Sequence, residues 1–240
     1  MARKPNRRSA RKSTERSPAR PPEAPATERD KIVAAFMALL AEKPLEQIGL
    51  MDIAQQAGIS LEQLRGAFGS KLAILAAHTK RVDRTVLGAD LSDMAEEPPR
   101  ERLFDVIMRR LEVLAPHREA VRSLLRSASR NPPLALALNG LAVRSQQWML
   151  TAAGIGSSGP RGMMRAQGLA MLFASVLRTW VNDDDPGLAR TMAALDRALA
   201  RGQRLLGLLD DLCFIPSRLC RLRSRRRRRY EDDSEETAAA

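Results

Sequence analysis

Two short segments have residue types and spacings that could do chemistry. Gly154, Gly156 and Gly159 match the GxGxxG pattern of loops that hold a phosphate group. The segment follows an expected helix rather than a strand and precedes a proline, so we interpret it as a loop between helices. Asp183–Asp185 could chelate a cation, but a solvated acidic run before a helix start explains the same residues more simply.

Other candidates for catalysis or metal binding are few. The only histidines are His78 and His117, and the only cysteines are Cys213 and Cys220. This inventory matches no zinc-ligand spacing, contains no CxxC pair and suggests no Ser/His/Asp or Cys/His set. We expect His117, which follows a proline, to lie at the surface where a helix starts. The sequence therefore predicts no enzyme, no metal and no cofactor.

The composition favours a chain built from closely packed helices. Of the 240 residues, 44% are hydrophobic but only 3% are aromatic, a balance that suits helices better than sheets. No stretch approaches the roughly 20 apolar residues of a membrane span. The basic N-terminus is not followed by the apolar segment of a secretory signal. We therefore expect a cytoplasmic protein whose cysteines are reduced.

The net charge of +12 lies mostly at the two ends of the chain. Residues 1–27 carry eight basic and two acidic residues, and residues 218–240 carry eight basic and five acidic residues. Only +3 therefore remains for the 190 residues between them. We expect both ends to be disordered tails that either bind polyanions without sequence preference or keep the protein soluble.

Apolar residues recur at helical spacing from about residue 29 onward, and no segment has the pattern of a strand. The expected helices cover residues 29–42, 51–57, 61–67, 71–87, 104–114, 132–148, 169–180 and 186–199. Asn131-Pro132 and Asp185-Pro186 each predict a helix start with proline in the first turn. We therefore expect an all-α architecture of roughly nine helices, with a linker over residues 88–99.

The segment Ile53–Ser60 predicts a helix-turn-helix. Two short helices are joined by a tight turn at Gly58, with Ile59 and Leu64 facing inward. Ala54 is small, which lets the second helix approach closely across the turn. In such a unit the helix that starts after residue 60 lies in the DNA major groove and presents its N-terminal side chains to the bases.

Over residues 29–75 the chain resembles the TetR family of bacterial transcriptional regulators. The matching pieces are Asp52-Ile53-Ala54, Ala57-Gly58-Ile59-Ser60, Leu64, Phe68, Ser70-Lys71 and Leu75. The resemblance implies a TetR-like, three-helix DNA-binding head with a linking helix, residues 28–87, and a helical ligand-binding and dimerisation body, residues 88–217. The residues it assigns to DNA contact are Ser60, Leu61, Glu62, Gln63, Arg65 and Lys71. Of these, Lys71 would contact backbone phosphate from a helix N-terminus.

The head departs from the family pattern in ways that concern DNA binding. Leu50-Met51 stands where the family usually has a hydroxyl residue opening the second helix, and Arg65 stands where it usually has an aromatic residue. Residues 28–87 carry eight basic and seven acidic residues, a net charge of only +1, although phosphate neutralisation supplies much of the affinity for DNA. A helix-turn-helix retained for packing alone is the alternative.

The body has a second, looser resemblance, over residues 111–200, to lipid-binding accessory proteins of ubiquinone biosynthesis that share the TetR fold. The matching pieces are Leu114–Ala120, Trp148 with Ala153-Gly154, and Trp180–Pro186 with Leu195-Asp196-Arg197. Those proteins carry a C-terminal amphipathic helix that lies on membranes. Here an apolar set precedes an arginine run, which suits contact with an anionic membrane: Leu205, Leu208, Leu209, Leu212, Ile215, Leu219 and Leu222. Packing of this segment on the body or on a dimer mate is the other interpretation.

Large apolar side chains of the body predict where a ligand would bind. The candidate lining residues of a pocket for a small apolar molecule or lipid are Phe104, Met108, Trp148, Met171, Phe173 and Trp180. Such residues at helical spacing are more often ordinary core. We expect two long helices, around residues 163–181 and 187–207, to form a four-helix bundle with a second copy. The leading hypothesis is a homodimeric regulator that binds operator DNA and responds to an apolar ligand; the alternative is a lipid-binding protein that does not read DNA.

Overall fold

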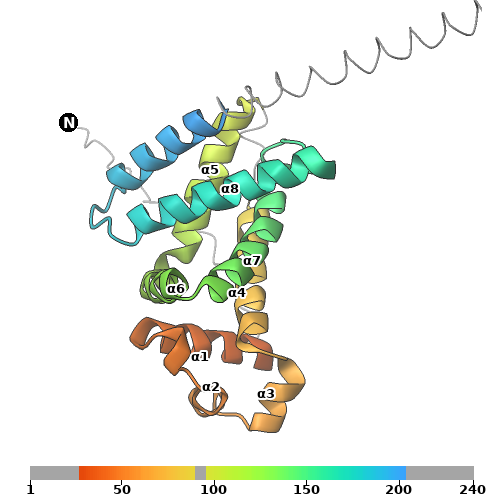
Figure 1. Cartoon of the computed structure of the whole chain (residues 1–240), viewed down its shortest axis with the longest axis vertical. Helices are drawn as coiled ribbons and strands as arrows, with labels where there is room; N and C mark the ends of the chain where they lie inside the picture. The colour runs from red at the N-terminus through yellow and green to blue at the C-terminus, as the bar shows by residue number, and fades with distance from the viewer. Residues whose placement is uncertain (1–26, 90–95, 204–240) are drawn as a thin grey trace, which may run out of the picture.

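The computed structural model describes residues 27–89 and 96–203, and every regular element within these ranges is a helix (Figure 1). The elements are α1 (Glu28–Glu42), the 3-10 helix η1 (Leu45–Gln47), α2 (Leu50–Ala57), α3 (Leu61–Ala67), α4 (Lys71–Leu87), α5 (Pro99–Leu114), the 3-10 helix η3 (Ala115–His117), α6 (Arg118–Arg130), α7 (Pro132–Ala152) and α8 (Gly159–Trp180). A further helix begins at residue 189 and is described to residue 203. The all-α prediction is confirmed for the described residues.

Some features expected from the sequence fall outside these ranges. They are the two tails apart from residue 27, the centre of the 88–99 linker, both cysteines and the apolar segment that precedes the arginine run. Among the helices that the structure does describe, none is both long and apolar enough to cross a membrane.

Side-chain caps begin several of the described helices, among them α1 and α7. Thr27 Oγ1 accepts a hydrogen bond from the Asp30 amide at 3.2 Å, and Asp30 Oδ2 accepts one from the Thr27 amide at 3.1 Å. This reciprocal capping box starts α1. At the start of α7, Asn131 Oδ1 accepts from the Leu134 amide at 3.0 Å, with Pro132 in the first turn. Both helices begin within one residue of the predicted position.

The predicted helix start at Asp185-Pro186 is wrong. The helix begins at residue 189, after Leu188, whose φ of 52° lies in the left-handed region. Asp185 Oδ2 accepts from the Ala189 amide at 3.0 Å, so this carboxylate closes a turn ahead of the helix. Asp183 is not solvated either: it is buried, and its Oδ2 accepts from the amide and the hydroxyl of Thr191 at 2.8 and 2.6 Å. The hydroxyl of Thr191 is the main cause that lowers the pKa of Asp183.

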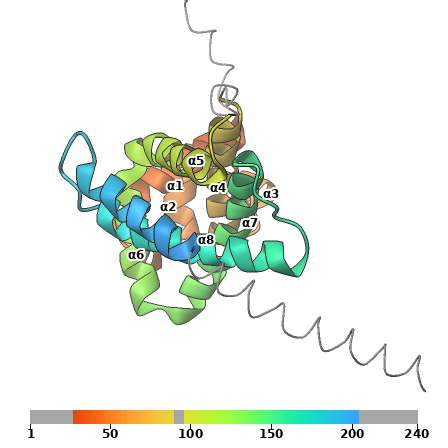
Figure 2. The same ribbon diagram turned by 90° about the horizontal axis from the view of Figure 1, so that it is seen from above.

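Two apolar clusters form the core of the residues that the structure describes, and α4 contributes to both. The head cluster, mainly at the bottom of Figure 1, joins α1, α2, α3 and the start of α4, where Ile74 is fully buried, to Ala120 of α6 and Leu134 of α7. The body cluster joins the second half of α4, through Val82 and Val86, to α5, α7, α8 and the 189–203 helix. The 189–203 helix lies beside α8 across the top of the molecule (Figures 1 and 2). Helix α4 is therefore one continuous connection between the two clusters.

Helix α6 lies between the head and the rest of the body, and the sequence prediction does not include it. Its buried residues are small: Ala120, Ser123 and Ser127. Its larger apolar side chains, Val121, Leu124 and Leu125, have helical spacing but are only partly buried. At its start, Arg118 Nη1 donates to the Asp183 carbonyl at 2.9 Å, and Arg122 donates to the Val181 carbonyl. These two arginines attach α6 to the C-terminal end of α8.

Candidate functional site

Residues Leu50–Ala67 form a helix-turn-helix, as predicted. Helix α2 ends at Gly58, whose φ of 66° glycine adopts without strain, and the Gly58 amide donates to the carbonyls of Ala54 and Gln55. The Ile59 amide also donates to the Ala54 carbonyl, at 3.0 Å. These hydrogen bonds close the C-terminus of α2 and direct the chain into α3.

Helix α3 presents its N-terminal turn to solvent. Ser60 Oγ accepts from the Gln63 amide at 3.1 Å, and Gln63 Oε1 accepts from the Ser60 amide at 2.9 Å, which fixes the start of the helix. Leu64 is buried and holds the inner face of α3 in the head cluster. The exposed residues around it are Leu61, Glu62, Gln63 and Arg65. The expected reading residues of α3 are therefore all accessible to a partner.

Arg29, on α1, fixes the C-terminal end of α3, a contact that the sequence prediction does not include. Its Nη1 donates to the Ala67 carbonyl at 2.5 Å, and its guanidinium lies over the Phe68 ring, 4.2 Å from the centroid. A cation at the last turn also complements the helix dipole. Arg65 Nη1 donates to the Gly69 carbonyl at 3.3 Å, yet the Arg65 side chain stays exposed.

Lys71 contacts the protein itself. Its Nζ donates to the carbonyl of Leu45 at 3.0 Å and to that of Ile48 at 2.9 Å. The lysine therefore ties the start of α4 to the segment between α1 and α2, and its side chain is half-buried. Because an ammonium group has three N–H donors and two of them are used here, the expected phosphate contact would rely on the third.

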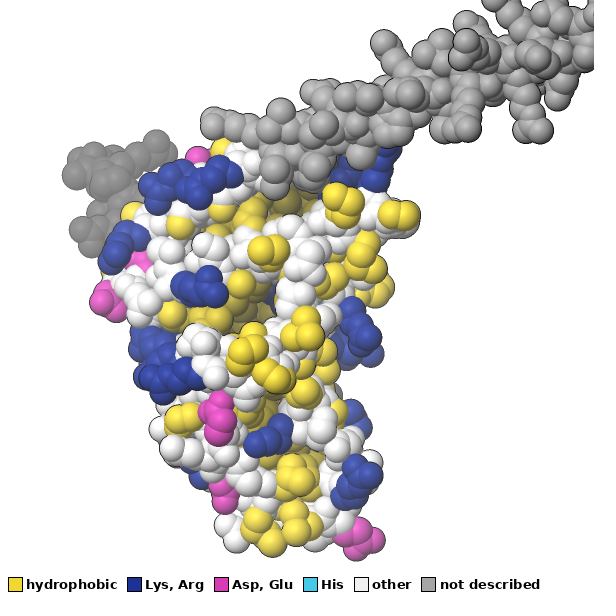
Figure 3. Space-filling view, viewed as in Figure 1, with side chains coloured by type: hydrophobic (Ala, Val, Ile, Leu, Met, Phe, Trp, Pro, Cys, Tyr) yellow, Lys and Arg dark blue, Asp and Glu magenta, His cyan; other side chains and the backbone are white. Residues whose placement is uncertain are grey.

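At the start of α2, an ion-paired carboxylate lies beside exposed apolar side chains. Asp52 accepts from the Gly49 amide at 3.0 Å, and Lys43 Nζ lies 2.8 Å from the same carboxylate. The hydrogen bonds from Lys43 and Gly49 lower the pKa of Asp52. Leu50 and Met51 beside this cap are about half exposed, at 51% and 50%. Figure 3 shows apolar and charged side chains mixed at this lower end of the molecule rather than a uniformly basic surface.

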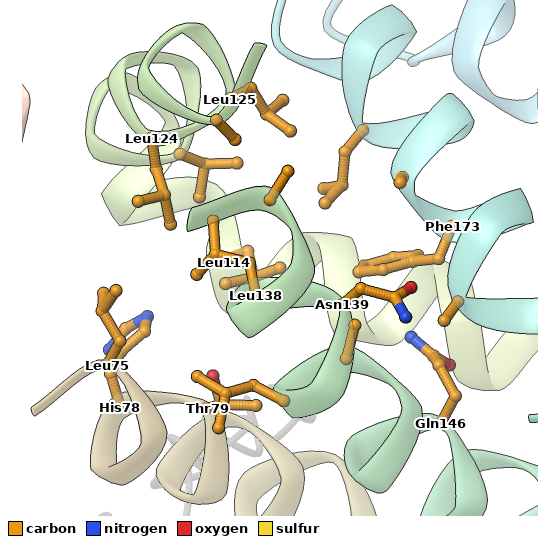
Figure 4. A pocket seen from close by; sticks show the side chains of 18 of the residues that line it. Leu75, His78, Thr79, Leu114, Leu124, Leu125, Leu138, Asn139, Gln146 and Phe173 are labelled. Carbon is orange, nitrogen blue, oxygen red and sulfur yellow. The ribbon is translucent and has the colours of Figure 1, made fainter. Parts of the chain in front are cut away.

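A cavity of about 380 Å³ lies where α4, α5, α6, α7 and α8 converge, and Met37 of α1 also lines it. Small-molecule sites have volumes of about 300–1,000 Å³. Its walls are mostly apolar, and each of the five helices contributes at least one side chain (Figure 4): Leu75, Leu114, Leu124, Leu138 and Phe173. The space-filling view shows a recess lined by apolar side chains on the face over α6, α7 and α8 (Figure 3). The cavity therefore has the size and lining of a site for a small, largely apolar molecule.

Two of the six predicted pocket residues line this cavity: Met171 and Phe173. Phe104 and Met108 instead pack against the body cluster from α5. Trp180 is fully buried beneath the Arg118 guanidinium, which lies 4.9 Å from its ring, and Trp148 is 60% exposed. Side-chain size indicates which residues favour burial. It does not indicate which of them face the cavity, because that depends on how five helices cross.

Buried polar groups line the cavity as well, and the sequence prediction does not include them. Arg110 is 5% exposed, and its Nη1 lies 2.5 Å from Asp83 Oδ1. The same carboxylate oxygen accepts from the Ser145 hydroxyl at 2.7 Å. Burial lowers the pKa of Arg110, against the opposing effect of the Asp83 carboxylate. Gln146, from the next position of α7, is fully buried at the cavity wall.

His78 lines the cavity from α4 and packs edge to face against His117, with ring centroids 4.8 Å apart. Burial is the main cause that lowers the pKa of His78 to about 4, and His117, Arg81 and Arg110 add to it. Burial also lowers the pKa of His117. His117 lies at a helix start as expected, because it precedes the first residue of α6, but η3 places it half-buried against α4 rather than at the surface.

The glycine-rich segment after residue 153 joins α7 to α8, which confirms the interhelical loop that the sequence predicts. Gly154 and Gly159 have φ values of 70° and 69°, so two of its three motif glycines adopt the left-handed conformation. In the part of the chain that the structure describes, no group of three or more His, Cys, Asp or Glu side chains is placed to hold a metal ion.

The arrangement of helices matches solved transcriptional regulators. The TetR transcriptional regulator from Nitrosomonas europaea ATCC 19718 superposes with a TM-score of 0.57, at 24% identity over 73% of this chain and 97% of its own. A TetR transcriptional regulator from Rhodococcus sp. RHA1 superposes with a TM-score of 0.54, at 22% identity over 73% of this chain and 95% of its own. No family model and no curated protein matches the chain.

The chain therefore has the TetR fold, a helix-turn-helix head on an all-helical body. Both neighbours are named as transcriptional regulators rather than as enzymes. The looser resemblance of the body to lipid-binding accessory proteins stays a prediction.

Proposed function

We propose that the chain is a homodimeric transcriptional regulator that binds operator DNA and responds to a small, largely apolar ligand. The observation that carries this proposal is the capped, accessible α3 behind the Gly58 turn, in the same fold as a ligand-sized cavity. The likeness of the fold to two TetR transcriptional regulators supports it.

In this proposal α3 enters the major groove and its exposed side chains read base edges. Arg65 offers paired N–H donors suited to guanine, Gln63 carries the amide that suits adenine, and Glu62 accepts from the amino group of cytosine. Leu61, which is 43% exposed, suits the methyl group of thymine. Lys71, at the start of α4, contacts phosphate and fixes the register of the head on the duplex.

A second copy of the chain would pack on α8 and the 189–203 helix. The outer face of α8 carries exposed residues at spacings of three and four: Met164, Gly168, Met171, Ser175 and Arg178. Small residues between methionines permit the close approach of a partner helix, as a four-helix bundle requires. Met171 and Arg178 of this stripe also line the cavity. The partner would therefore cover part of the cavity opening, which couples ligand binding to dimer geometry.

Helix α6 contacts both the cavity and the head, and it could couple ligand binding to the position of the head. Leu124 and Leu125 line the cavity, whereas Ser127 is hydrogen-bonded to the head segment at Leu45. Arg122 attaches the start of α6 to the end of α8. A ligand that displaces α6 would therefore change both the position of the head and the end of the dimer helix, which is the two-site linkage that ligand response requires.

A gel-shift titration of the full chain against its own upstream DNA, at defined salt, tests this proposal. We expect a complex that survives excess nonspecific DNA and weakens in Arg65→Ala, because specificity resides in base contacts. A control variant replaces the five arginines at 225–229 with glutamine and should retain the preference. Binding that ignores sequence and disappears in the glutamine variant would overturn the proposal, since the charge would then bind without any reading by α3.

The second candidate is a lipid-binding accessory protein of ubiquinone biosynthesis that does not read DNA and whose C-terminal region contacts anionic membrane. The near-neutral head and the exposed Leu50 and Met51 favour it. Extraction of the purified chain followed by mass spectrometry, together with flotation on liposomes containing anionic lipid, tests this candidate. No extracted lipid and no flotation would contradict it.

A further inference from the structure

The side chain of Gln146 is the strongest unexplained feature of the cavity. It has no exposed surface, yet neither its amide nitrogen nor its carbonyl oxygen has a hydrogen-bond partner. Buried amides of this kind are almost always paired, because an unpaired one destabilises the folded chain. Figure 4 shows the amide of Gln146 pointing into the cavity near Asn139 and Phe173.

The neighbouring amide, that of Asn139, does have a hydrogen-bond partner. Asn139 Nδ2 donates to Gln167 Oε1 at 3.0 Å, and Gln167 Nε2 donates to Asn139 Oδ1 at 3.1 Å, so these two amides satisfy each other. Gln146 makes no such pair. The two N–H donors and the carbonyl acceptor of this amide, at the α7–α8 end of the cavity, are therefore without a protein partner.

Arg110 adds a second donor to the cavity wall. Its Nη1 binds Asp83, but its Nε has no hydrogen-bond partner, although the residue is 5% exposed. The Asp83 carboxylate balances the guanidinium charge, and the Ser145 hydroxyl also donates to that carboxylate. A bound carboxylate would therefore bring an additional, uncompensated charge into a buried site, which is unfavourable. The other cation of the lining, Arg178, is exposed to solvent.

From these groups we infer that the cavity binds a neutral molecule with a long apolar part and one uncharged polar group, an alcohol or a carboxamide. The polar group donates to Gln146 Oε1 and accepts from Gln146 Nε2 or Arg110 Nε, while the apolar part lies along the leucine-lined wall that Leu114, Leu124 and Leu138 provide. This inference rests on the proposed function only in taking the cavity as the ligand site; it names the chemical class of that ligand. The neutral state of the His78 imidazole, whose pKa is about 4, keeps the opposite wall uncharged as well.

Three probes of similar length and different polar ends test the inference: decan-1-ol, decanoate and 1-fluorodecane. Isothermal titration calorimetry on the full chain should give a Kd for decan-1-ol that is at least about tenfold lower than the Kd for 1-fluorodecane. The reason is that only the alcohol pairs with the buried polar groups. Decanoate should bind more weakly than decan-1-ol at neutral pH. Failure of decan-1-ol to bind, equal affinity for decan-1-ol and 1-fluorodecane, or tightest binding of decanoate would overturn the inference.

A matched pair of variants tests whether Gln146 causes the preference for decan-1-ol. Gln146→Leu should lose the preference for decan-1-ol over 1-fluorodecane and melt at a higher temperature without ligand, because an unpaired buried amide is removed. Gln147→Leu makes the same chemical change at the next residue, which does not line the cavity, and should keep the preference. Retention of the preference in Gln146→Leu would also overturn the inference. No DNA enters these titrations, so their failure is distinguishable from failure of the gel-shift test.

Discussion

Ser127, on α6, is hydrogen-bonded to Leu45 of the head, although 82 residues separate them along the chain. The Leu45 amide donates to Ser127 Oγ at 3.3 Å, and the same hydroxyl donates to the Glu46 carboxylate at 2.9 Å. Ser123 Oγ, one turn earlier, donates to the Lys43 carbonyl at 3.2 Å. An adjacent face of α6, with Leu124 and Leu125, lines the cavity. One short helix therefore contacts both the ligand site and the segment that precedes the helix-turn-helix.

Ser127→Ala should weaken the attachment of the head. The variant leaves a buried backbone amide and a carboxylate without their partner, so we expect the free energy of unfolding to fall by about 1–2 kcal/mol. Urea denaturation measures this value. Ser129→Ala is the control, because Ser129 lies on the same helix but is exposed and donates only to the Arg126 carbonyl within α6. An equal effect of the two variants would contradict a specific role for the contact between α6 and the head.

Asp83→Asn should be among the most destabilising single changes in the body. It removes the charge that balances Arg110 in a place where both side chains are buried, at 11% and 6% exposure. Loss of one partner from a buried ion pair costs about 3–5 kcal/mol, because the other charge is left uncompensated. The measurement is again urea denaturation, at neutral pH.

The control for Asp83→Asn is Asp196→Asn, which breaks an ion pair with Arg100. Asp196 is 58% exposed, so this pair is screened by solvent, and its loss should cost less than about 1 kcal/mol. Similar losses in the two variants would mean that Arg110 finds another compensating group in the folded chain.

The helices of the head could be predicted from the sequence because local signals decide them. Thr27 and Ser60 cap helices through their own side chains, and Gly58 ends α2 by its left-handed conformation. Each of these features depends on residues within a few positions. The missed start of the last helix shows the limit, because Asp183 and Thr191 form the decisive hydrogen bond across eight residues.

The cavity could be predicted only in part. Phe173 faces it and Trp148 faces solvent, although both are aromatic residues on long body helices. The polar lining was not predictable, because Arg110 and Gln146 are usually surface residue types and their burial depends on the crossing of α4, α5 and α7. Helix α6 was missed although Val121, Leu124 and Leu125 have helical spacing along it, so a sequence signal for this helix was present.

Lys71→Met and Arg65→Met should weaken DNA binding in different ways. Lys71→Met should reduce affinity about equally for operator and nonspecific DNA and lower the salt slope by about 1, because it removes one phosphate contact. Arg65→Met should instead relax discrimination at one base pair, by about 1–3 kcal/mol. Fluorescence anisotropy titrations at several salt concentrations measure both effects.

The two variants should also differ in their free energy of unfolding. Lys71 Nζ is bonded to the Leu45 and Ile48 carbonyls, so Lys71→Met should also lower the free energy of unfolding by about 1–2 kcal/mol. Arg65 is exposed, so Arg65→Met should change it by less than about 0.5 kcal/mol. A Lys71→Met variant with unchanged stability and an unchanged salt slope would argue that this lysine touches neither the head segment nor the phosphate.

The buried His78 should make the folded chain less stable as the pH falls from about 6.5 to about 4. Its pKa is lowered from 6.5 to about 4, mainly by burial, so in this window the unfolded chain binds a proton that the folded chain does not. The contribution of His78 to the free energy of unfolding is therefore fully present above pH 6.5. It is lost as the pH falls toward the pKa of His78 in the folded chain. The difference between the pKa values of His78 in the unfolded and the folded chain corresponds to about 3 kcal/mol in the free energy of unfolding.

Urea denaturation at a series of pH values checks this expectation against His78→Gln, which cannot take up the proton. The variant should lose most of the slope between pH 6.5 and 4. A smaller slope should remain, because burial also lowers the pKa of His117 and the sign of its contribution is the same. The carboxylates Asp30, Asp52 and Asp183 have pKa values lowered from 3.8, so their contributions are lost below this window. An unchanged slope in His78→Gln would mean that the imidazole is protonated in the folded chain, and that the cavity wall beside it carries charge.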